Sequence, residues 1–480
     1  MDDVHLLADR EEWAVCQFGT AELGDRRRTR RLVKVAAQAA GNSCGSIPQQ
    51  AGRWADAKAA YRLFDTEEVT HAAVCQPHFD WTRQRAGELP MVFLVQDVMT
   101  AAFTSHHACR GLGPVGTQDG PTGLHQMNVL AVDSVRRQPM GLMYQRHYVR
   151  PPEPLDTRRH IRRKIPSQQR ESHWWVEAIR TIGSPPPEVR WVHVGDRGED
   201  MFVAYHQART QRTDWLIRVA RDRSVLTPEG PDRLFDYVRR LPTRMHKTIV
   251  TRRPKAEAPE HVPLNIAVGE VILKPSRYEP EQREFDPIPC RLVRVWETSP
   301  PPGHDAMEWI LCTSLPCQTD TMLGLVADGY GCRWMIEEFH KCEKTGCQIE
   351  QRRLESRDRL EPLIGMLSVL PVRLLALKLV ARDDPEAPAG TMFDDLMIDV
   401  MAKHLNRTAP TKGPADTTRY TAATLTVGQF WRGIGLLGGH LGRKGDGPIG
   451  WLRAWRGWQS FHLMILGAHL TSPHETKKYG

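Results

Sequence analysis

A short segment between residues 327 and 353 carries acidic, basic and phenolic side chains at regular spacing. Tyr330, Arg333, Glu337 and Lys344 occur in the string ADGYGCRWMIEEFHKCEKTGCQIEQRR. A helix turns by about 100° per residue, which places the last three within roughly 60° of Tyr330, with Lys341 on the same face. One helix face would therefore carry a carboxylate, three cations and a phenol. This combination is suited to metal-dependent phosphate chemistry.

Two aspartates elsewhere in the chain could complete a metal site with Glu337. Asp97 follows MVFLVQ and Asp196 follows WVHVG, so we expect both just past the carboxyl end of an apolar strand. Open α/β sheets place their ligands there. If the two strands are neighbours, the aspartates converge, and a helix behind them would present Glu337. Three carboxylates suit Mg²⁺ or Mn²⁺, and two ions about 3.5–4 Å apart would activate an attacking oxygen and stabilise a leaving one.

Each of these acids also has a simpler structural explanation. An aspartate that closes a strand is commonly a turn former or a helix cap, and in GDRGED the cap could be Asp196 or Asp200. Glu337 and Lys341 could form an ordinary surface ion pair four residues apart. The combination of three acids, rather than any one of them, predicts the metal site.

The ten cysteines indicate a reducing compartment, because they follow no disulfide framework. Cys312 with Cys317, and Cys342 with Cys347, repeat a C-x4-C spacing beside His340, which leaves zinc as an alternative. No CxxC pair occurs, and this favours free, partly buried thiols. Neither a signal peptide nor a membrane-spanning apolar run is evident, so we expect a cytoplasmic protein that binds no membrane.

Length and charge limit the kind of protein this is. A chain of 480 residues exceeds what one core usually supports, so two or three domains are expected. With 65 Lys and Arg against 57 Asp and Glu, the net charge is +8, which favours a polyanionic partner. Ordinary solvated surfaces would also explain any single basic cluster. The clusters lie at residues 26–34, 158–164, 239–255 and 352–359.

Hydrophobic patterns predict the elements that position these residues. Helices interleaved with apolar strands indicate an α/β core. Helices are expected at residues 12–18, from about 24 to 41, 55–64, 167–182 and 200–209, and strands at 91–96, 127–133, 140–148, 189–195 and 215–220, with a Pro-rich and Arg-rich linker at 150–166.

The second half of the chain predicts an insertion and then helices. Residues 222–305 contain short β segments between Pro-rich turns, which indicates a β-rich insertion. A strand at 309–313 and a long helix at 321–344 follow, and this helix would carry the segment described first. The remaining elements are a helix at 360–380, a linker at 382–390 and a helical end in which Trp451, Trp455 and Trp458 form a stripe typical of a core or a subunit interface.

The spacing of the acidic and basic residues resembles a known family. Tyr330, Arg333, Glu337 and Lys344 match, at every position, the signature Y-x2-R-x3-E-x6-K of bacterial cut-and-paste DDE transposases, which excise an element through DNA hairpins. The neighbouring strings RWMIEEFHK and KTG also resemble that family.

The resemblance extends over nearly the whole chain. Asp97 corresponds to the first catalytic aspartate of the family, and Asp196, in the pattern V-x-D-R-x-x-D, corresponds to the second. The strings LGDRRRTRRLVKVAAQ and AAYRLFD are similar to the transposon-end-binding domain, and LLGGHLGRKGDGPIGW resembles the dimerisation region. Two features depart from the family: Val98 and Met99 follow Asp97 where hydroxyl residues are usual, and residues 255–305 align poorly.

The resemblance implies a fold and a domain organisation. It implies a ribonuclease-H-like α/β catalytic core with a β-rich insertion, flanked by helical domains. The expected domains are a DNA-binding domain at residues 1–75, a catalytic domain at 76–381 with the insertion at about 222–305, and a dimerisation domain at 382–480.

The resemblance also implies roles for individual residues. Asp97, Asp196 and Glu337 would be the catalytic metal ligands, holding two Mg²⁺ or Mn²⁺ ions. Trp309 looks like the tryptophan that stacks on a base flipped out of the hairpin, although a core residue at a strand start is the alternative. The other DNA-binding residues would be Tyr330, Arg333, Lys341, Lys344, Arg218, Arg26, Arg27, Arg30, Arg31 and Arg62.

The expected function is therefore DNA transposition in the bacterial cytoplasm, at the nucleoid. The protein would bind inverted repeats at the ends of its element, pair them as a homodimer, cut through a hairpin intermediate and join the 3′ ends to target DNA. Two alternatives stay open. One is a metal-dependent nuclease without strand transfer, and the other is a DNA-binding regulator that has lost catalysis.

Overall fold

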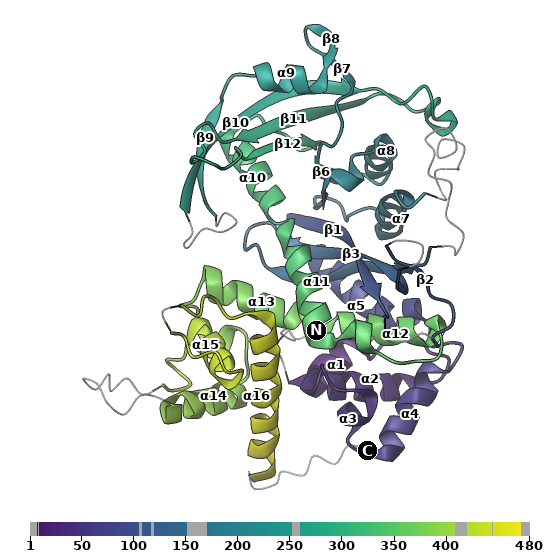
Figure 1. Ribbon diagram of the computed structural model, residues 1–480, viewed down its shortest axis with the longest axis vertical. Helices are drawn as coiled ribbons and strands as arrows, with labels where there is room; N and C mark the ends of the chain where they lie inside the picture. The colour runs from purple at the N-terminus through teal and green to yellow at the C-terminus, as the bar shows by residue number, and fades with distance from the viewer. Residues whose placement is uncertain are drawn as a thin grey trace, which may run out of the picture.

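The computed structural model describes Leu7 and residues 9–104, 108–116, 120–150, 170–251, 260–408, 420–443 and 445–471. Most of the linker predicted at residues 150–166, and the basic cluster at 158–164, lie outside the described residues. In Figure 1 the β-rich insertion lies at one end of the molecule, and the amino-terminal and carboxyl-terminal helices lie at the other.

The amino-terminal region is helical, as predicted. Asp9 and Asp25 begin the first two helices, because their carboxylates accept the backbone N–H groups of Glu11 and Arg27. The expected domain boundary at residue 75 falls inside α5, and the division into domains stays a prediction. The helices are α1 (Arg10–Phe18), α2 (Arg26–Gly41), α3 (Ile47–Ala51), α4 (Trp54–Phe64) and α5 (His71–Ala86), of which α3 and α5 were not predicted.

The described strands form one large mixed sheet. β1 pairs antiparallel with β3 and parallel with β5, which is parallel to β6 in turn. The other edge of β3 pairs with β4 and with the short β2. This part of the sheet consists of β1 (Met91–Ala102), β2 (Gly113–Pro114), β3 (Thr122–Asp133), β4 (Pro139–Tyr148), β5 (Arg190–Gly195) and β6 (Asp214–Arg218).

The insertion continues this sheet instead of forming a separate one. β12 (Glu308–Thr313) pairs antiparallel with β6 on one side and with β11 on the other. The insertion also contains a seven-residue helix that the sequence did not reveal, because it is too short for a clear periodicity. Its elements are β7 (Ser224–Thr227), β8 (Gly230–Arg233), α9 (Leu234–Arg240), β9 (Met245–Thr251), β10 (Glu260–Leu273) and β11 (Ile288–Trp296).

Helices cover both faces of the sheet. α7 (His173–Ile182) and α8 (Phe202–Thr210) pack on one face, and α11 (Trp334–Cys347) crosses β1 and β3 on the other (Figure 1). The prediction of a single long helix at 321–344 is wrong, because α10 (Asp320–Gly331) ends before α11 begins. A tight turn separates them, in which the Met335 N–H donates to the Cys332 carbonyl (2.9 Å). Two glycines around Tyr330 lower the helix propensity there.

The carboxyl-terminal helices share one core with the rest of the molecule. A continuous cluster of buried side chains extends from Trp13 to Phe461. Trp451, Trp455 and Trp458 are buried in it, which confirms the predicted core stripe. Residues 357–383 are long and apolar enough to cross a membrane, but 94% of their apolar 18-residue window is buried, as in a core helix. The helices are α12 (Arg357–Ser368), α13 (Leu370–Asp383), α14 (Asp395–Thr408), α15 (Val427–Leu437) and α16 (Trp451–Thr471).

Candidate active site

Asp97 lies inside β1, which corrects the prediction that it follows the strand. β1 runs on to Ala102 because its antiparallel partner β3 is equally long. The parallel pairing of β1 with β5, however, ends at Val95 opposite Val194. Asp97 therefore comes two residues after Val95, and Asp196 comes two residues after Val194. The two aspartates follow the last parallel pair by the same distance in the sequence. Since side chains alternate along a strand, Asp97 shares the face of Val95, which is the face that α11 covers.

Asp196 and Asp200 have different roles in the structure. Asp200 is buried, and its carboxylate accepts the Tyr205 hydroxyl (2.6 Å) and the Ala220 backbone N–H (2.7 Å) and pairs with Arg223. Asp196 is only half-buried and accepts the Gly198 N–H (2.7 Å) at the start of a short 3₁₀ turn. Asp200 thus holds the fold together, and Asp196 keeps ligand capacity.

The adjacent glutamates of α11 point to different partners. Glu337 accepts a hydrogen bond from the Arg333 guanidinium (2.8 Å). Glu338 instead binds the Lys378 ammonium (2.7 Å) and the indole N–H of Trp451 (3.1 Å), so it ties α11 to the carboxyl-terminal helices. The surface pair of Glu337 with Lys341 that the sequence left open is not formed, because Lys341 pairs with Glu338 (3.3 Å).

The three predicted metal ligands influence one another electrostatically. Burial, together with the negative charges of Asp196 and Glu337, raises the pKa of Asp97 to about 6. The Val98 N–H (2.7 Å) and the Arg333 guanidinium act in the opposite direction. The two neighbouring negative charges therefore make ionisation of Asp97 less favourable.

The carboxylates of Asp97, Asp196 and Glu337 are not arranged around a common metal position in this structure. Within the described ranges, no group of three His, Cys, Asp or Glu residues is placed to hold a metal ion. This finding argues against the zinc alternative, since Cys312 lies on β12 and Cys342 and Cys347 lie on α11. Glu337 is not turned toward Asp97 and Asp196 as a ligand because its carboxylate is paired with Arg333. Binding of a metal ion by Glu337 would require this ion pair to open.

Three residues predicted to contact DNA meet beside the acids. The ring centroids of Trp309 and Tyr330 lie 5.5 Å apart at an interplanar angle of 60°. Arg218, paired with Leu311 across β6 and β12, donates to the Glu308 carbonyl (3.0 Å). Burial raises the pKa of Tyr330, whereas the nearby Arg333 and Arg218 lower it. Residues far apart in the sequence are therefore brought together.

Lys344 faces the sheet, whereas Lys341 does not. The Lys344 ammonium donates to the Thr100 carbonyl of β1 (2.5 Å) and pairs with Glu350 (3.1 Å). Glu350 also accepts the Ala102 backbone N–H (3.0 Å). Glu350 was not predicted, and it holds Lys344 near the end of β1.

The amino-terminal arginines predicted to bind DNA lie on α2 and α4, and all except the half-buried Arg31 are exposed. Arg31 pairs with Asp56 (2.8 Å) and so links α2 to α4, while Arg27 pairs with Asp25 (2.9 Å). For the part of the chain that the structure describes, no ion pair occupies the exposed side chains of Arg26, Arg30 and Arg62.

A buried acid that the sequence did not single out lies behind Asp196. Glu199 is fully buried and accepts a hydrogen bond from Gln96 of β1. Burial, together with the charge of Asp196, raises its pKa well above the ordinary value. The glutamate in GDRGED was the available signal, but charged residues in such turns are usually exposed.

The fold and these residues define an α/β protein with a large mixed sheet and amino-terminal helices that carry exposed arginines. One comparison with known proteins narrows this class. Residues 10–69 match the family model described as transposase DNA-binding. The match covers α1 to α4 and the exposed arginines, so the chain carries a transposase DNA-binding domain. This domain supports a DNA-binding transposase, with DNA as the partner.

Proposed function

We propose that this protein is a DDE transposase of the hairpin-forming family with the Y-x2-R-x3-E-x6-K signature. One observation carries the proposal. Asp97 lies on β1 and Asp196 directly follows β5, the neighbouring parallel strand, and Glu337 lies close enough on the covering helix to affect the pKa of Asp97. The transposase DNA-binding domain supports it independently.

The topology supports a ribonuclease-H-like core for this chemistry. The strands follow the order β4-β3-β1-β5-β6, with β4, β3 and β1 antiparallel to one another and β1, β5 and β6 parallel. The β-rich insertion follows β6, and α11 with Glu337 comes after the insertion. This is the arrangement that the resemblance implies.

The donor set fits divalent metal ions. Asp97, Asp196 and Glu337 offer only carboxylate oxygens, which Mg²⁺ and Mn²⁺ prefer. Two bound ions would supply activation of the attacking oxygen and stabilisation of the leaving oxygen. When Glu337 is released from Arg333, the guanidinium becomes free to bind a phosphate with two parallel hydrogen bonds.

The remaining residues would position the DNA. Arg333 and Lys344 would hold phosphates beside the cleaved bond, and the Tyr330 hydroxyl would donate to another. Trp309, which is half-buried beside Tyr330, would stack on a base flipped out of the hairpin, with Arg218 nearby.

The proposed reaction has four phosphoryl transfers. Water attacks the phosphodiester at the element end and leaves a 3′-hydroxyl. This hydroxyl attacks the opposite strand and forms the hairpin, which a second water opens. The 3′-hydroxyl released again then attacks target DNA and joins the element to it.

End binding would depend on the amino-terminal domain. Arg26, Arg30 and Arg62 are exposed and available for phosphates, and each phosphate neutralised makes the affinity more sensitive to salt. Arg31, which is held by Asp56, would instead fix the angle between α2 and α4.

A homodimer would pair the two element ends. Leu463, Leu466 and Leu470 recur at helical spacing on α16 and are 64, 42 and 76% exposed. An exposed leucine stripe on a terminal helix is suited to a symmetric contact with a second copy. The protein would act in the bacterial cytoplasm, at the nucleoid.

The proposal is tested with the purified protein, DNA that carries the element's own ends, and Mg²⁺. Denaturing gels should show nicks, hairpins and joined products. Asp97→Ala, Asp196→Ala and Glu337→Ala should each abolish all three products while end binding stays within about twofold of wild type, because the metal ligands lie outside the end-binding helices.

Other outcomes identify the alternatives. Cutting that ignores the end sequence and yields no hairpin indicates a nuclease without strand transfer. Sequence-specific binding with no product in wild type indicates a regulator and contradicts the proposal.

A further inference from the structure

A row of buried amide side chains crosses the sheet beside Asp97. Asn128 of β3 lies directly opposite Asp97 in the antiparallel pair, and Gln145 of β4 lies opposite Asn128. Opposite residues share a face, so this row and Asp97 lie under α11. Gln126, Asn128 and Gln145 are all at most 3% exposed. Burying amides is unfavourable unless each finds a partner in a fixed direction.

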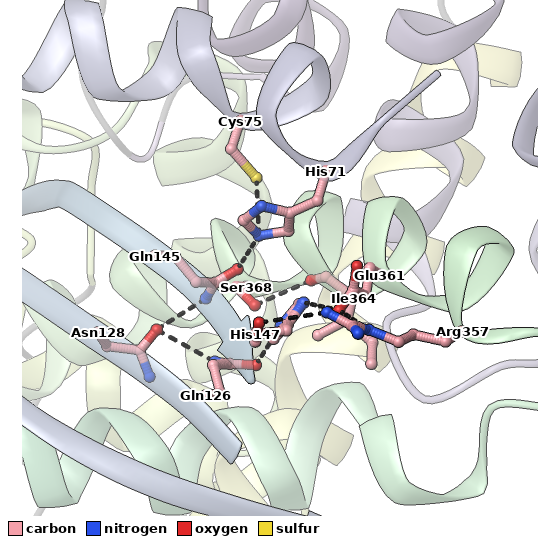
Figure 2. A network of polar contacts seen from close by, with 10 residues as sticks. All are labelled: His71, Cys75, Gln126, Asn128, Gln145, His147, Arg357, Glu361, Ile364 and Ser368. Carbon is pink, nitrogen blue, oxygen red and sulfur yellow. Dashed lines mark hydrogen bonds and ion pairs between the residues drawn. The ribbon is translucent and has the colours of Figure 1, made fainter. Parts of the chain in front are cut away.

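The hydrogen bonds fix the orientation of the Asn128 amide. Its oxygen accepts from the side-chain nitrogens of Gln126 (3.1 Å) and Gln145 (2.7 Å), so its nitrogen must point away from both (Figure 2). That nitrogen lies 3.0 Å from His340 Nε2 of α11. An amide nitrogen only donates, so His340 Nε2 must be unprotonated. Burial, helped by Lys344, lowers the pKa of His340 to about 3, which agrees.

Two histidines at the ends of the row hold it to α5 and within β4. His71 of α5 lies 3.0 Å from the Gln145 amide oxygen, and His147 of β4 lies 3.0 Å from the Gln126 amide oxygen. Figure 2 shows these contacts converging on Gln126, Asn128 and Gln145 from several elements.

A second contact ties the row to α11. Gln126 donates to the buried carboxylate of Glu343 (3.0 Å), which also accepts the Ser368 hydroxyl of α12. α11 is thus held three and six residues beyond Glu337, at His340 and Glu343. Sliding of α11 along the sheet would break both contacts.

We propose that Asn128 is a positioning residue that acts through His340. By linking the strand beside Asp97 to the helix that carries Glu337, it sets the separation of the two carboxylates. This inference rests on the proposed metal site and assigns a role to residues outside the signature. Apolar side chains would pack the same space without fixing the position of the helix along its axis.

The central variant is Asn128→Leu, which keeps the approximate volume and removes the donor to His340. Mn²⁺ binding is followed on the full chain by electron paramagnetic resonance, and Mg²⁺-dependent nicking of end DNA is followed on gels. We expect Mn²⁺ affinity to fall, and the Mg²⁺ requirement for nicking to rise, by about tenfold or more, as for other residues that orient metal ligands.

Gln145→Met is the matched control. It removes two hydrogen bonds from the same buried row without touching α11, so it should lower the midpoint of thermal unfolding as Asn128→Leu does but keep the metal dependence of wild type. His340→Gln supplies another acceptor and should retain metal binding, whereas His340→Leu should behave like Asn128→Leu. His340→Leu also serves if Asn128→Leu does not fold.

Hydrogen exchange supplies a readout that needs no metal. Amides of α11 should exchange faster in Asn128→Leu than in Gln145→Met. The positioning role is overturned if α11 exchanges equally fast in Asn128→Leu and Gln145→Met and if Asn128→Leu keeps the metal dependence of wild type. If Asp97→Ala is inactive in the same assays, the proposed metal site stands and only the role of Asn128 is rejected. Loss of the proposed function looks different: wild type itself then neither binds Mn²⁺ nor nicks DNA, and the exchange comparison still decides whether Asn128 holds α11.

Discussion

At the scale of single residues, environment decides what each acid does. Asp200 and Glu338 are occupied by cations and hydrogen bonds that hold the fold, whereas the charges of Asp196 and Glu337 help to raise the pKa of Asp97. Glu343 has a third role, because it is fully buried among neutral hydrogen-bond donors.

Glu343 should make the stability of the protein depend on pH. Burial raises its pKa to about 7, so the folded state keeps a proton that the unfolded chain loses near its ordinary value. Its stabilising contribution is complete at low pH and is lost as the pH rises through about 7. Glu343→Gln is neutral at every pH, so it should gain up to about 3 kcal/mol relative to wild type between pH 5 and 8. Urea unfolding at both pH values measures this, and parallel pH profiles would contradict it.

At the scale of elements, the sequence predicted most strands and the helices with clear periodicity, but not where they stop. Asp97 was placed after its strand because the apolar run ends at Val95, yet pairing with β3 extends β1 by several residues. The break between α10 and α11 was missed because the polar stripe fits one helix. The signature residues were found because their spacing is local. Asn128 and Glu350 were not, since their partners lie far away in the chain.

Gly329 should resist substitution even though it lies in a helix. A Cβ at this position of α10 would lie 2.6 Å from the ring of Phe93 in β1, in the buried core. Gly329→Ala should therefore destabilise by about 1–3 kcal/mol and impair nicking, because it displaces the neighbouring Tyr330.

Gly324→Ala in the same helix is the control. Its Cβ meets only the end of Met245 at 3.9 Å, so the helix propensity of alanine should stabilise the protein by up to about 1 kcal/mol. Thermal unfolding compares the two variants, and equal effects would show that the contact with Phe93 is unimportant.

At the scale of the whole molecule, the amino-terminal helices are attached to the end of α11, the helix that carries Glu337. Arg352 is buried, and its guanidinium donates to the carbonyl of Cys347 at the end of α11 (2.9 Å) and to the carbonyls of Ser43 and Gly45, between α2 and α3. The Cys44 thiol adds a contact to the Gly346 carbonyl (3.0 Å). These contacts join the proposed end-binding helices to the helix of the proposed active site, and no sequence motif predicted them.

Arg352→Leu should loosen this connection. It leaves three carbonyls without their charged donor, which should cost roughly 3 kcal/mol or more in the free energy of unfolding. Arg353→Leu, at the exposed neighbouring position, should stay within about 0.5 kcal/mol of wild type. Urea unfolding measures both, and equal losses would mean that the buried contacts contribute little.

The most direct test of the account compares the two adjacent glutamates of α11. In single-turnover nicking of end DNA with Mg²⁺, Glu337→Gln should lose activity by about a thousandfold or more, because a metal ligand is removed. Glu338→Gln should nick within about tenfold of wild type and lose stability instead, because it weakens a half-buried ion pair with Lys378 and a hydrogen bond from Trp451. Equal nicking by Glu337→Gln and wild type would contradict the assignment of Asp97, Asp196 and Glu337 as one metal-binding active site.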